Sequence, residues 1–211
     1  MLRKILRGFR CAALVGAALL GVVSARAEWV DYRDSAGEKR SAECTIVESM
    51  DVASLFVDGG WYAVKGKNIT RGEIGIRGTV HLILCDDACL TANGSNAGAT
   101  GIALASGNSL TIYGQENGTG KLVAIGGEHS AGIGCQRANP EVFGAGDLTI
   151  CGGNIEAIGN GCAAGIGGSN SHPDGSASSF IPWIGYGNGG TVEIYGGKVT
   201  ATPGAGYEGG G

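Results

Sequence analysis

Short segments in which apolar and polar residues alternate recur along the chain from about residue 80 onward. The clearest begin at Leu82, Leu110, Leu148 and Val192, and in each a second aliphatic residue follows two positions later. A period of two places alternate side chains on one side of a β-strand, so these aliphatic residues would face a common interior. No segment of residues 61–211 has the length and 3.6-residue period of an amphipathic helix. The pattern predicts an all-β protein.

The alternating segments belong to a three-part repeat. Each is followed by a second strand-like segment and then by a third that is rich in small residues. The first family is Leu82–Cys85, Leu110–Tyr113, Leu148–Cys151 and Val192–Tyr195; the second is Leu90–Ala92, Leu122–Ala124, Ile155–Ala157 and Val199–Ala201; the third is Gly101–Leu104, Ala131–Gly134, Ala164–Gly167 and Ala205–Tyr207; a weaker copy is Trp61–Val64, Asn68–Thr70 and Ile74–Ile76. Because one unit cannot bury its own inward side, the repeat predicts a parallel β-solenoid of about five stacked three-strand rungs.

Glycine makes the bends of this expected fold possible. The chain has 42 glycines in 211 residues, well above the usual ~7%. Pairs such as Gly152-Gly153 fall between strands, where a tight turn often requires positive φ. Unequal spacing between the repeats predicts longer loops at residues 136–147 and 169–191.

The two ends of the repeat differ. Residues Trp29–Arg33 and Lys39–Val47 alternate around Ser35-Ala36-Gly37, which predicts a β-hairpin that caps the N-terminal end. The opposite end has no recognisable cap, so end-to-end self-association is one expectation. The chain then divides into a signal peptide at residues 1–27, the hairpin cap at 28–60 and the β-helix domain at 61–211.

The first 27 residues have the features of a secretory signal. A basic start precedes the apolar run Cys11–Val23, and Ala25-Arg26-Ala27 supplies small residues for cleavage. The run is too short to span a bilayer core of about 30 Å, so no membrane span is expected in the mature chain. Cleavage would remove five positive charges and no acid, taking the net charge from −4 to −9. These features predict a secreted, cell-surface or periplasmic protein that does not bind nucleic acid.

Six cysteines follow the predicted signal. They are Cys44, Cys85, Cys89, Cys135, Cys151 and Cys162. An even number in an oxidising compartment favours disulfides, with buried free thiols as the alternative, and the spacing leaves the pairing open. No C-x-x-C pair is present, which makes a zinc site a weaker alternative.

Several sequence motifs of the repeat are also found together in a known family of proteins. They are Gly60-Trp61-Tyr62, His81–Asp86, Asn108–Gln115, Gly118–Leu122 and Ser130–Gly134. The chain resembles the glycine-rich, right-handed parallel β-helix repeat proteins that bacteria secrete or display, which are grouped with carbohydrate-binding, adhesin-like and pectate-lyase-like solenoids. The resemblance implies a right-handed β-helix and export, and supplies no ligand motif.

Aromatic and acidic side chains provide the candidate sites. Tyr113 and Tyr195 are expected on one outward line with Cys85 and Cys151, and Trp183 and Tyr186 lie in the long apolar loop. Aromatic rings of this kind can stack on sugar rings, whereas packing against the protein is the alternative. Asp86 and Asp87, between Cys85 and Cys89, could help to bind Ca²⁺, and a solvated turn is the alternative reading.

Three functions follow from these features. The first is a secreted or cell-surface, non-catalytic binding or adhesion module, with a polysaccharide or cell-surface glycan as its ligand and no obligatory cofactor. The second is a purely structural segment of a surface repeat protein. The third is a degenerate polysaccharide lyase, which would require outward acids for calcium and a basic residue on one sheet. The outward positions expected on the first sheet, Ile83, Thr111, Thr149 and Glu193, do not form that set.

Overall fold

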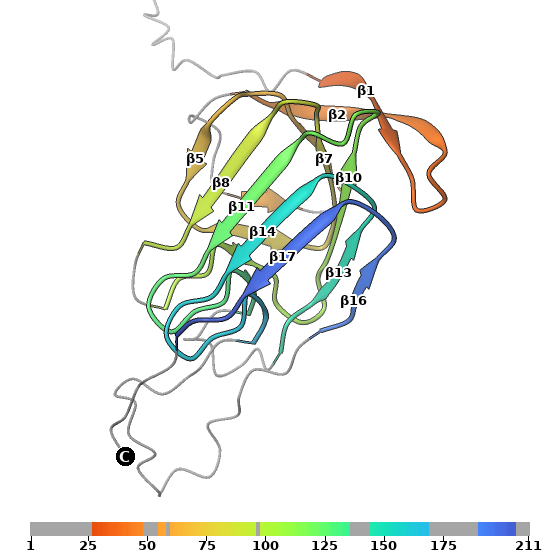
Figure 1. The fold of residues 1–211 in the computed structure, drawn as a ribbon. Coiled ribbons are helices and arrows are strands. Elements are labelled where there is room, and N and C mark those ends of the chain that lie inside the picture. Colours follow the sequence, from red (N-terminus) through yellow and green to blue (C-terminus); the bar gives the residue numbers. More distant parts are fainter. Residues whose placement is uncertain are drawn as a thin grey trace, which may run out of the picture.

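The computed structural model describes residues 27–48, 55–57, 60–95, 98–135, 144–168 and 190–205. These ranges contain seventeen strands and no helix (Figure 1). A helix able to cross a membrane is accordingly not found among them.

The strands form three sheets, and from β4 onward successive strands belong to sheets 1, 2 and 3 in turn. Sheet 1 contains β1 (Ala27–Arg33), β2 (Lys39–Val47), β4 (Trp61–Val64), β7 (Thr79–Leu84), β10 (Ser109–Gly114), β13 (Asp147–Ile150) and β16 (Val192–Ile194), in that order. Sheet 2 contains β5 (Ile69–Arg71), β8 (Cys89–Asn93), β11 (Lys121–Ile125), β14 (Asn154–Ile158) and β17 (Lys198–Thr202). Sheet 3 contains β3 (Leu55–Val57), β6 (Ile74–Arg77), β9 (Ile102–Ala103), β12 (Ile133–Gly134) and β15 (Ile166–Gly167).

This architecture corrects the predicted fold class. A single right-handed parallel β-helix of about five three-strand rungs with a separate hairpin cap is wrong, because the strands form three separate sheets of seven, five and five strands. The largest sheet is mixed: β1 pairs antiparallel with β2, and β2 pairs parallel with β4. The described pairings do not close the sheets onto one another. Alternation along the chain indicates which side chains face inward, but not how sheets formed from distant segments join.

Aliphatic side chains from neighbouring strands form the core between the sheets. Ile112 pairs with Leu82 on one side and with Ile150 on the other, and all three are fully buried. The predicted alignment of Leu82 with Leu110 is wrong by two residues, because Leu110 pairs with Val80. Strand β7 begins at Thr79, so its inward series starts earlier than the sequence comparison indicated.

Sheets 2 and 3 approach each other closely along a column of small residues. Ala92, Ala124 and Ala157 pair in register on sheet 2 and are fully buried. Gly132 lies beside them: a Cβ added there would be 2.6 Å from the backbone nitrogen of Ile158 and 2.7 Å from the carbonyl oxygen of Ala124. The third segment of the repeat is therefore rich in small residues because the neighbouring backbone leaves no room for a larger side chain.

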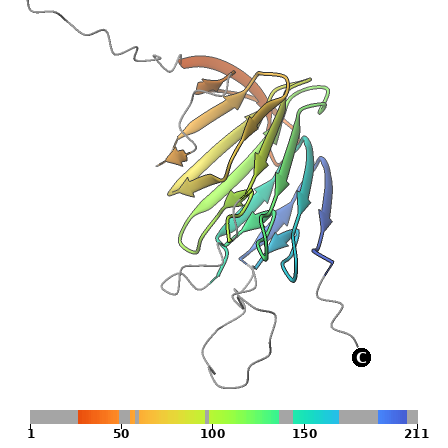
Figure 2. The ribbon, with the colours of Figure 1, turned by 90° about the vertical axis from the view of Figure 1, so that its left-hand side faces the viewer.

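The β1–β2 hairpin folds back over the outer face of sheet 1 (Figures 1 and 2). Strand β1 is separated from β10 by three strands in the order of the sheet, yet it contacts β10. Val30 of β1 and Cys44 of β2 are buried there, and the outward-facing Ile83 has no exposed surface. The hairpin is thus part of sheet 1 and creates a second apolar layer over its outer face.

We expect Gly132→Ala to destabilise the protein by about 1 to 3 kcal/mol, since the new methyl group meets backbone atoms that cannot rotate away. Urea unfolding followed by circular dichroism measures the change. Gly72→Ala is the matched control, because a Cβ at Gly72 has no atom within 4 Å. Equal stabilities of the two variants would contradict the close approach of sheets 2 and 3.

Candidate functional site

A groove lies between the free edge of β1 and the turns that follow β7 and β10. Two hollows, of about 170 Å³ and about 450 Å³, adjoin there and share Asp31, Asp86 and Gln115. We call this region the β1 groove, and its lining residues are Trp29, Val30, Asp31, Tyr32, Arg33, Lys39, Lys65, Cys85, Asp86, Gln115 and Glu116.

The alternation of β1 determines what faces the groove. Val30 and Tyr32 turn towards sheet 1, so Trp29, Asp31 and Arg33 lie on the opposite side of the strand. In an antiparallel pair, backbone groups of alternate residues point away from the partner strand. The carbonyl oxygen of Asp31 accepts a hydrogen bond of 2.9 Å from Gln115 Nε2, which places this set of backbone groups on the groove side.

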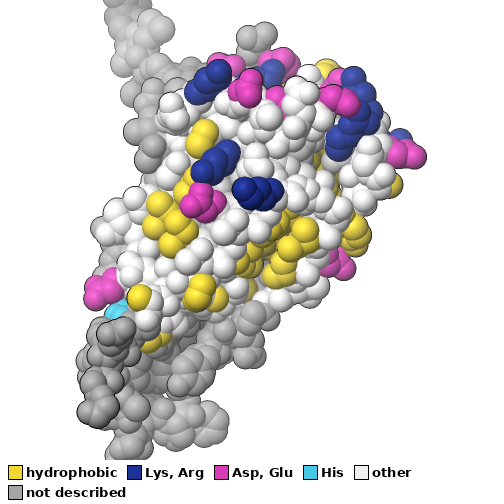
Figure 3. Space-filling model, in the orientation of Figure 1, with side chains coloured by type: hydrophobic (Ala, Val, Ile, Leu, Met, Phe, Trp, Pro, Cys, Tyr) yellow, Lys and Arg dark blue, Asp and Glu magenta, His cyan; other side chains and the backbone are white. Residues whose placement is uncertain are grey.

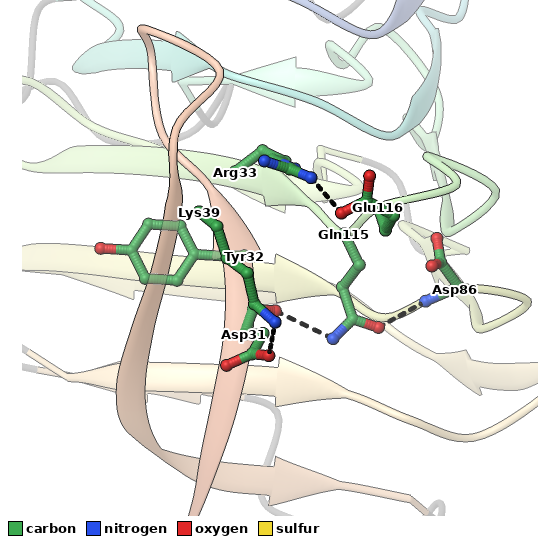
Figure 4. Close-up of a pocket in the computed structure, with 7 residues that line it drawn as sticks. All are labelled: Asp31, Tyr32, Arg33, Lys39, Asp86, Gln115 and Glu116. Carbon is green, nitrogen blue, oxygen red and sulfur yellow. Dashed lines mark hydrogen bonds and ion pairs between the residues drawn. The ribbon is translucent and has the colours of Figure 1, made fainter.

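Gln115 connects the hairpin to the turn after β7 (Figure 4). Its Nε2 donates to Asp31, and its Oε1 accepts a hydrogen bond of 2.9 Å from the backbone N–H of Asp86. The Asp86 carboxylate in turn accepts hydrogen bonds from the backbone and side chains of Asn117 and Thr119. One amide side chain therefore fixes the distance between the two walls of the groove.

Ion pairs surround the groove. Lys39 Nζ lies 2.6 Å from Asp31 Oδ2, and Arg33 pairs with Glu116 (Figure 4). Lys65 Nζ lies 2.6 Å from Glu28 Oε1 at the other end. The hydrogen bond from Lys39, followed by that from Ser41, lowers the pKa of the Asp31 carboxyl and keeps it ionised.

Trp29 forms an exposed apolar surface beside these polar groups. Its relative exposure is 70%, against 3% for the neighbouring Val30. A tryptophan side chain this exposed presents a ring face to solvent, which is a surface on which a sugar ring can stack.

Tyr113, one of the predicted ligand-binding residues, lies beneath the hairpin. Its ring centroid is 4.6 Å from that of Tyr32 and 5.4 Å from that of Trp61, and its hydroxyl lies 3.1 Å from His81 Nδ1. Burial raises the pKa of Tyr113 to about 12 and lowers the pKa of His81. Only 9% of Tyr113 is exposed, so it contributes to packing in this arrangement.

The other predicted aromatic residues are not brought together with Tyr113. Tyr195 follows β16 and is exposed, and its hydroxyl donates a hydrogen bond of 3.3 Å to Glu193. Trp183 and Tyr186 lie outside the described residues. The expected outward line is also altered, because Tyr113 pairs with Ile83 where Cys85 was expected.

Asp86 and Asp87 lie in the turn after β7, and hydrogen bonds engage both residues. Asp86 accepts the bonds described above, and the backbone N–H of Asp87 donates to Thr119 Oγ1 at 2.9 Å. In the described ranges, no three His, Cys, Asp or Glu residues gather as a metal site would require. The arrangement links two successive turns of the chain.

No disulfide joins any of the six predicted candidates in the structure. Cys44, Cys85, Cys135 and Cys151 are buried, Cys89 is partly buried and Cys162 is exposed. Burial raises the pKa of Cys44 and of Cys85 to about 11.

Sequence reasoning did not identify the β1 groove. The alternation of Trp29, Asp31 and Arg33 within the predicted hairpin was a usable signal, because a tryptophan among charged residues on one side of a strand is not a core pattern. No sequence signal indicates that Gln115 reaches Asp31, which is 84 residues away.

We expect the thiols to differ strongly in reactivity. At pH 8 a pKa near 11 leaves roughly 100-fold less thiolate than a pKa near 9, and burial slows Cys44 and Cys85 further. Labelling with a disulfide reagent, followed by peptide mass mapping, should modify Cys162 first and these two last. Labelling in urea is the control, since the six thiols from Cys44 to Cys162 should then react alike. Rapid labelling of Cys44 and Cys85 in the folded protein, or failure of any of these six thiols to react in urea without reductant, would contradict the structure.

Comparisons with protein-family models, with curated proteins and with solved structures found no match. The resemblance to secreted β-helix repeat proteins therefore remains a prediction.

Proposed function

We propose that this protein is an exported, non-catalytic module that binds a polysaccharide in the β1 groove. The observation that carries the proposal is the exposed ring of Trp29 at the edge of a hollow lined by hydrogen-bonding groups. Sugar rings have apolar faces and polar rims, so a ligand of this class uses a stacking surface and a set of donors and acceptors together.

The rigidity of the groove supports this function. Gln115 joins the hairpin to the turn at Asp86, and Tyr32 anchors the hairpin among Trp61 and Tyr113. A preformed site spends less of its interaction energy on ordering its own side chains when a ligand binds. The groove is also open along β1, which suits a chain that continues beyond the bound segment.

Binding is a better account of the groove than sugar elimination. A lyase needs a basic side chain with a free lone pair close to the sugar, and acids that are available for calcium. In the groove, Lys39 and Arg33 are cations of ion pairs, and the Asp86 carboxylate holds the next turn.

We expect Trp29→Ala to weaken polysaccharide binding about 10-fold, because a stacked ring contributes roughly 1 to 1.5 kcal/mol. Calorimetric titration with oligosaccharides selected in a glycan screen measures the loss, and the thermal midpoint should not change because Trp29 is mostly exposed. Tyr195→Ala removes another exposed aromatic ring and serves as the control, with wild-type affinity expected. Failure of the wild-type protein to bind any saccharide, with or without Ca²⁺, would contradict the proposal that it binds carbohydrate.

A second candidate function is self-association through the β16–β17 end. Val192 and Ile194 of β16 occupy inward positions, yet they are 44% and 55% exposed, whereas their partners Leu148 and Ile150 are 2% and 0% exposed. Hydrophobic side chains gather at this end of the molecule (Figure 3). Strands β16 and β17 are also the edges of their sheets, so their outer backbone groups can pair with another strand.

The end of the molecule opposite β16 and β17 favours a closed dimer over an open array of copies joined end to end. Ile69 of the edge strand β5 is 3% exposed, so the apolar interior is already covered there. Antiparallel pairing of β17 with its copy, centred on Thr200, would place Val199 opposite Ala201 and Lys198 opposite Thr202. This pairing keeps inward residues inward and opposes no like charges.

We expect the protein to form dimers whose fraction rises with concentration, and Ile194→Lys to abolish them because a buried, unpaired charge would lie in the interface. Light scattering coupled to size exclusion measures the mass. Thr149→Lys adds the same charge to the outer side of the adjacent strand and should dimerise normally. A wild-type protein that stays monomeric at every concentration would rule out this function.

A further inference from the structure

The charges that line the β1 groove balance one another. Three are negative and three positive, namely Asp31, Asp86, Glu116, Arg33, Lys39 and Lys65. A groove with no net charge offers no attraction at long range to an ionic ligand. The chain as a whole carries a formal charge of −4, which disfavours polyanions.

Each cation of the groove already has an anion of the protein. Lys39 lies 2.6 Å from Asp31, Lys65 lies 2.6 Å from Glu28, and Arg33 pairs with Glu116. A carboxylate or sulfate of a ligand would meet each cation together with the protein anion beside it. Attraction to the cation is then offset by repulsion from that anion, so the ion pair offers an anionic ligand no net attraction.

Hydroxyl groups do not meet this obstacle. An ionised carboxylate has about four acceptor positions and a lysine three donors, so a paired group can still bond to a sugar hydroxyl. The backbone groups on the free edge of β1 add neutral donors and acceptors to the hollow that Trp29 also lines.

We infer that the ligand of the β1 groove is an uncharged polysaccharide, selected over uronate-containing and sulfated chains by ion pairs that occupy the cations. The inference rests on the proposed function, because it specifies the class of polysaccharide bound at that site. The stacking ring of Trp29 and the internally paired charges together define the selectivity.

Binding of neutral and acidic polymers at two salt concentrations tests the inference. Mixed-linkage β-glucan, galactomannan and arabinan are the neutral probes, and polygalacturonate and alginate are the acidic ones. Neutral polymers should bind at least 10-fold more tightly, with less than about 2-fold change between about 50 and 500 mM NaCl, because the interaction involves no net charge. Calorimetric or surface-based titration of the wild-type protein gives these affinities.

Opposite results separate the two proposals. Tighter binding of the acidic polymers, or affinity that falls steeply with salt, would overturn the neutral selectivity while leaving polysaccharide binding intact. Binding of neither class would overturn the proposed function and the inference together.

The variant Glu116→Gln tests the cause of the selectivity. Removing the partner of Arg33 exposes one cation in the groove, so binding of polygalacturonate should rise several-fold and become sensitive to salt. Glu193→Gln changes the net charge equally on strand β16, outside the groove, and should leave this preference unchanged. Identical behaviour of the two variants would show that the ion pairs do not set the selectivity.

Discussion

The structure depends on the burial of inward aliphatic side chains between successive strands of the same sheet. Leu82 has no interior of its own until Ile112 lies beside it, and Ile112 in turn requires Ile150. Each such side chain contributes roughly 1.5 to 3 kcal/mol when it leaves water. The column of small residues, the turn hydrogen bonds and the hairpin add to a structure that these stacked aliphatic side chains hold together.

This dependence explains which parts of the fold could be read from the sequence. The alternation around Leu110 and Leu148 predicts both strands and their mutual register, because each inward residue pairs with an equivalent one. The position of β7 was not predictable in the same way, since Val80 and Leu82 are equally suitable partners for Leu110. Likewise, the sequence contains the hairpin, but its return over sheet 1 depends on contacts of Tyr32 with Trp61 and Tyr113. Such contacts leave no local periodicity.

The site was less predictable than the fold for the same reason. A tyrosine in a strand looks identical whether a hairpin covers it or not, so Tyr113 resembled a ligand-binding residue. Trp29 is exposed because β1 turns its other side to sheet 1, which the pattern of the hairpin indicates only once its docking face is known. The role of Gln115 is set by two backbone groups, at Asp31 and Asp86, that no side-chain pattern identifies.

The link from Gln115 to Asp31 also bears on the order in which the molecule matures. Strand β1 is among the first described segments of the chain, yet the residue that anchors it is made 84 positions later. Synthesis at about 5 to 20 residues per second therefore leaves the hairpin without its anchor for several seconds. During that interval the face formed by Val30 and Tyr32 lacks the surface that it later covers. Any ability to bind a ligand in the β1 groove can therefore appear only after the strand that carries Tyr113 has been synthesised and has folded.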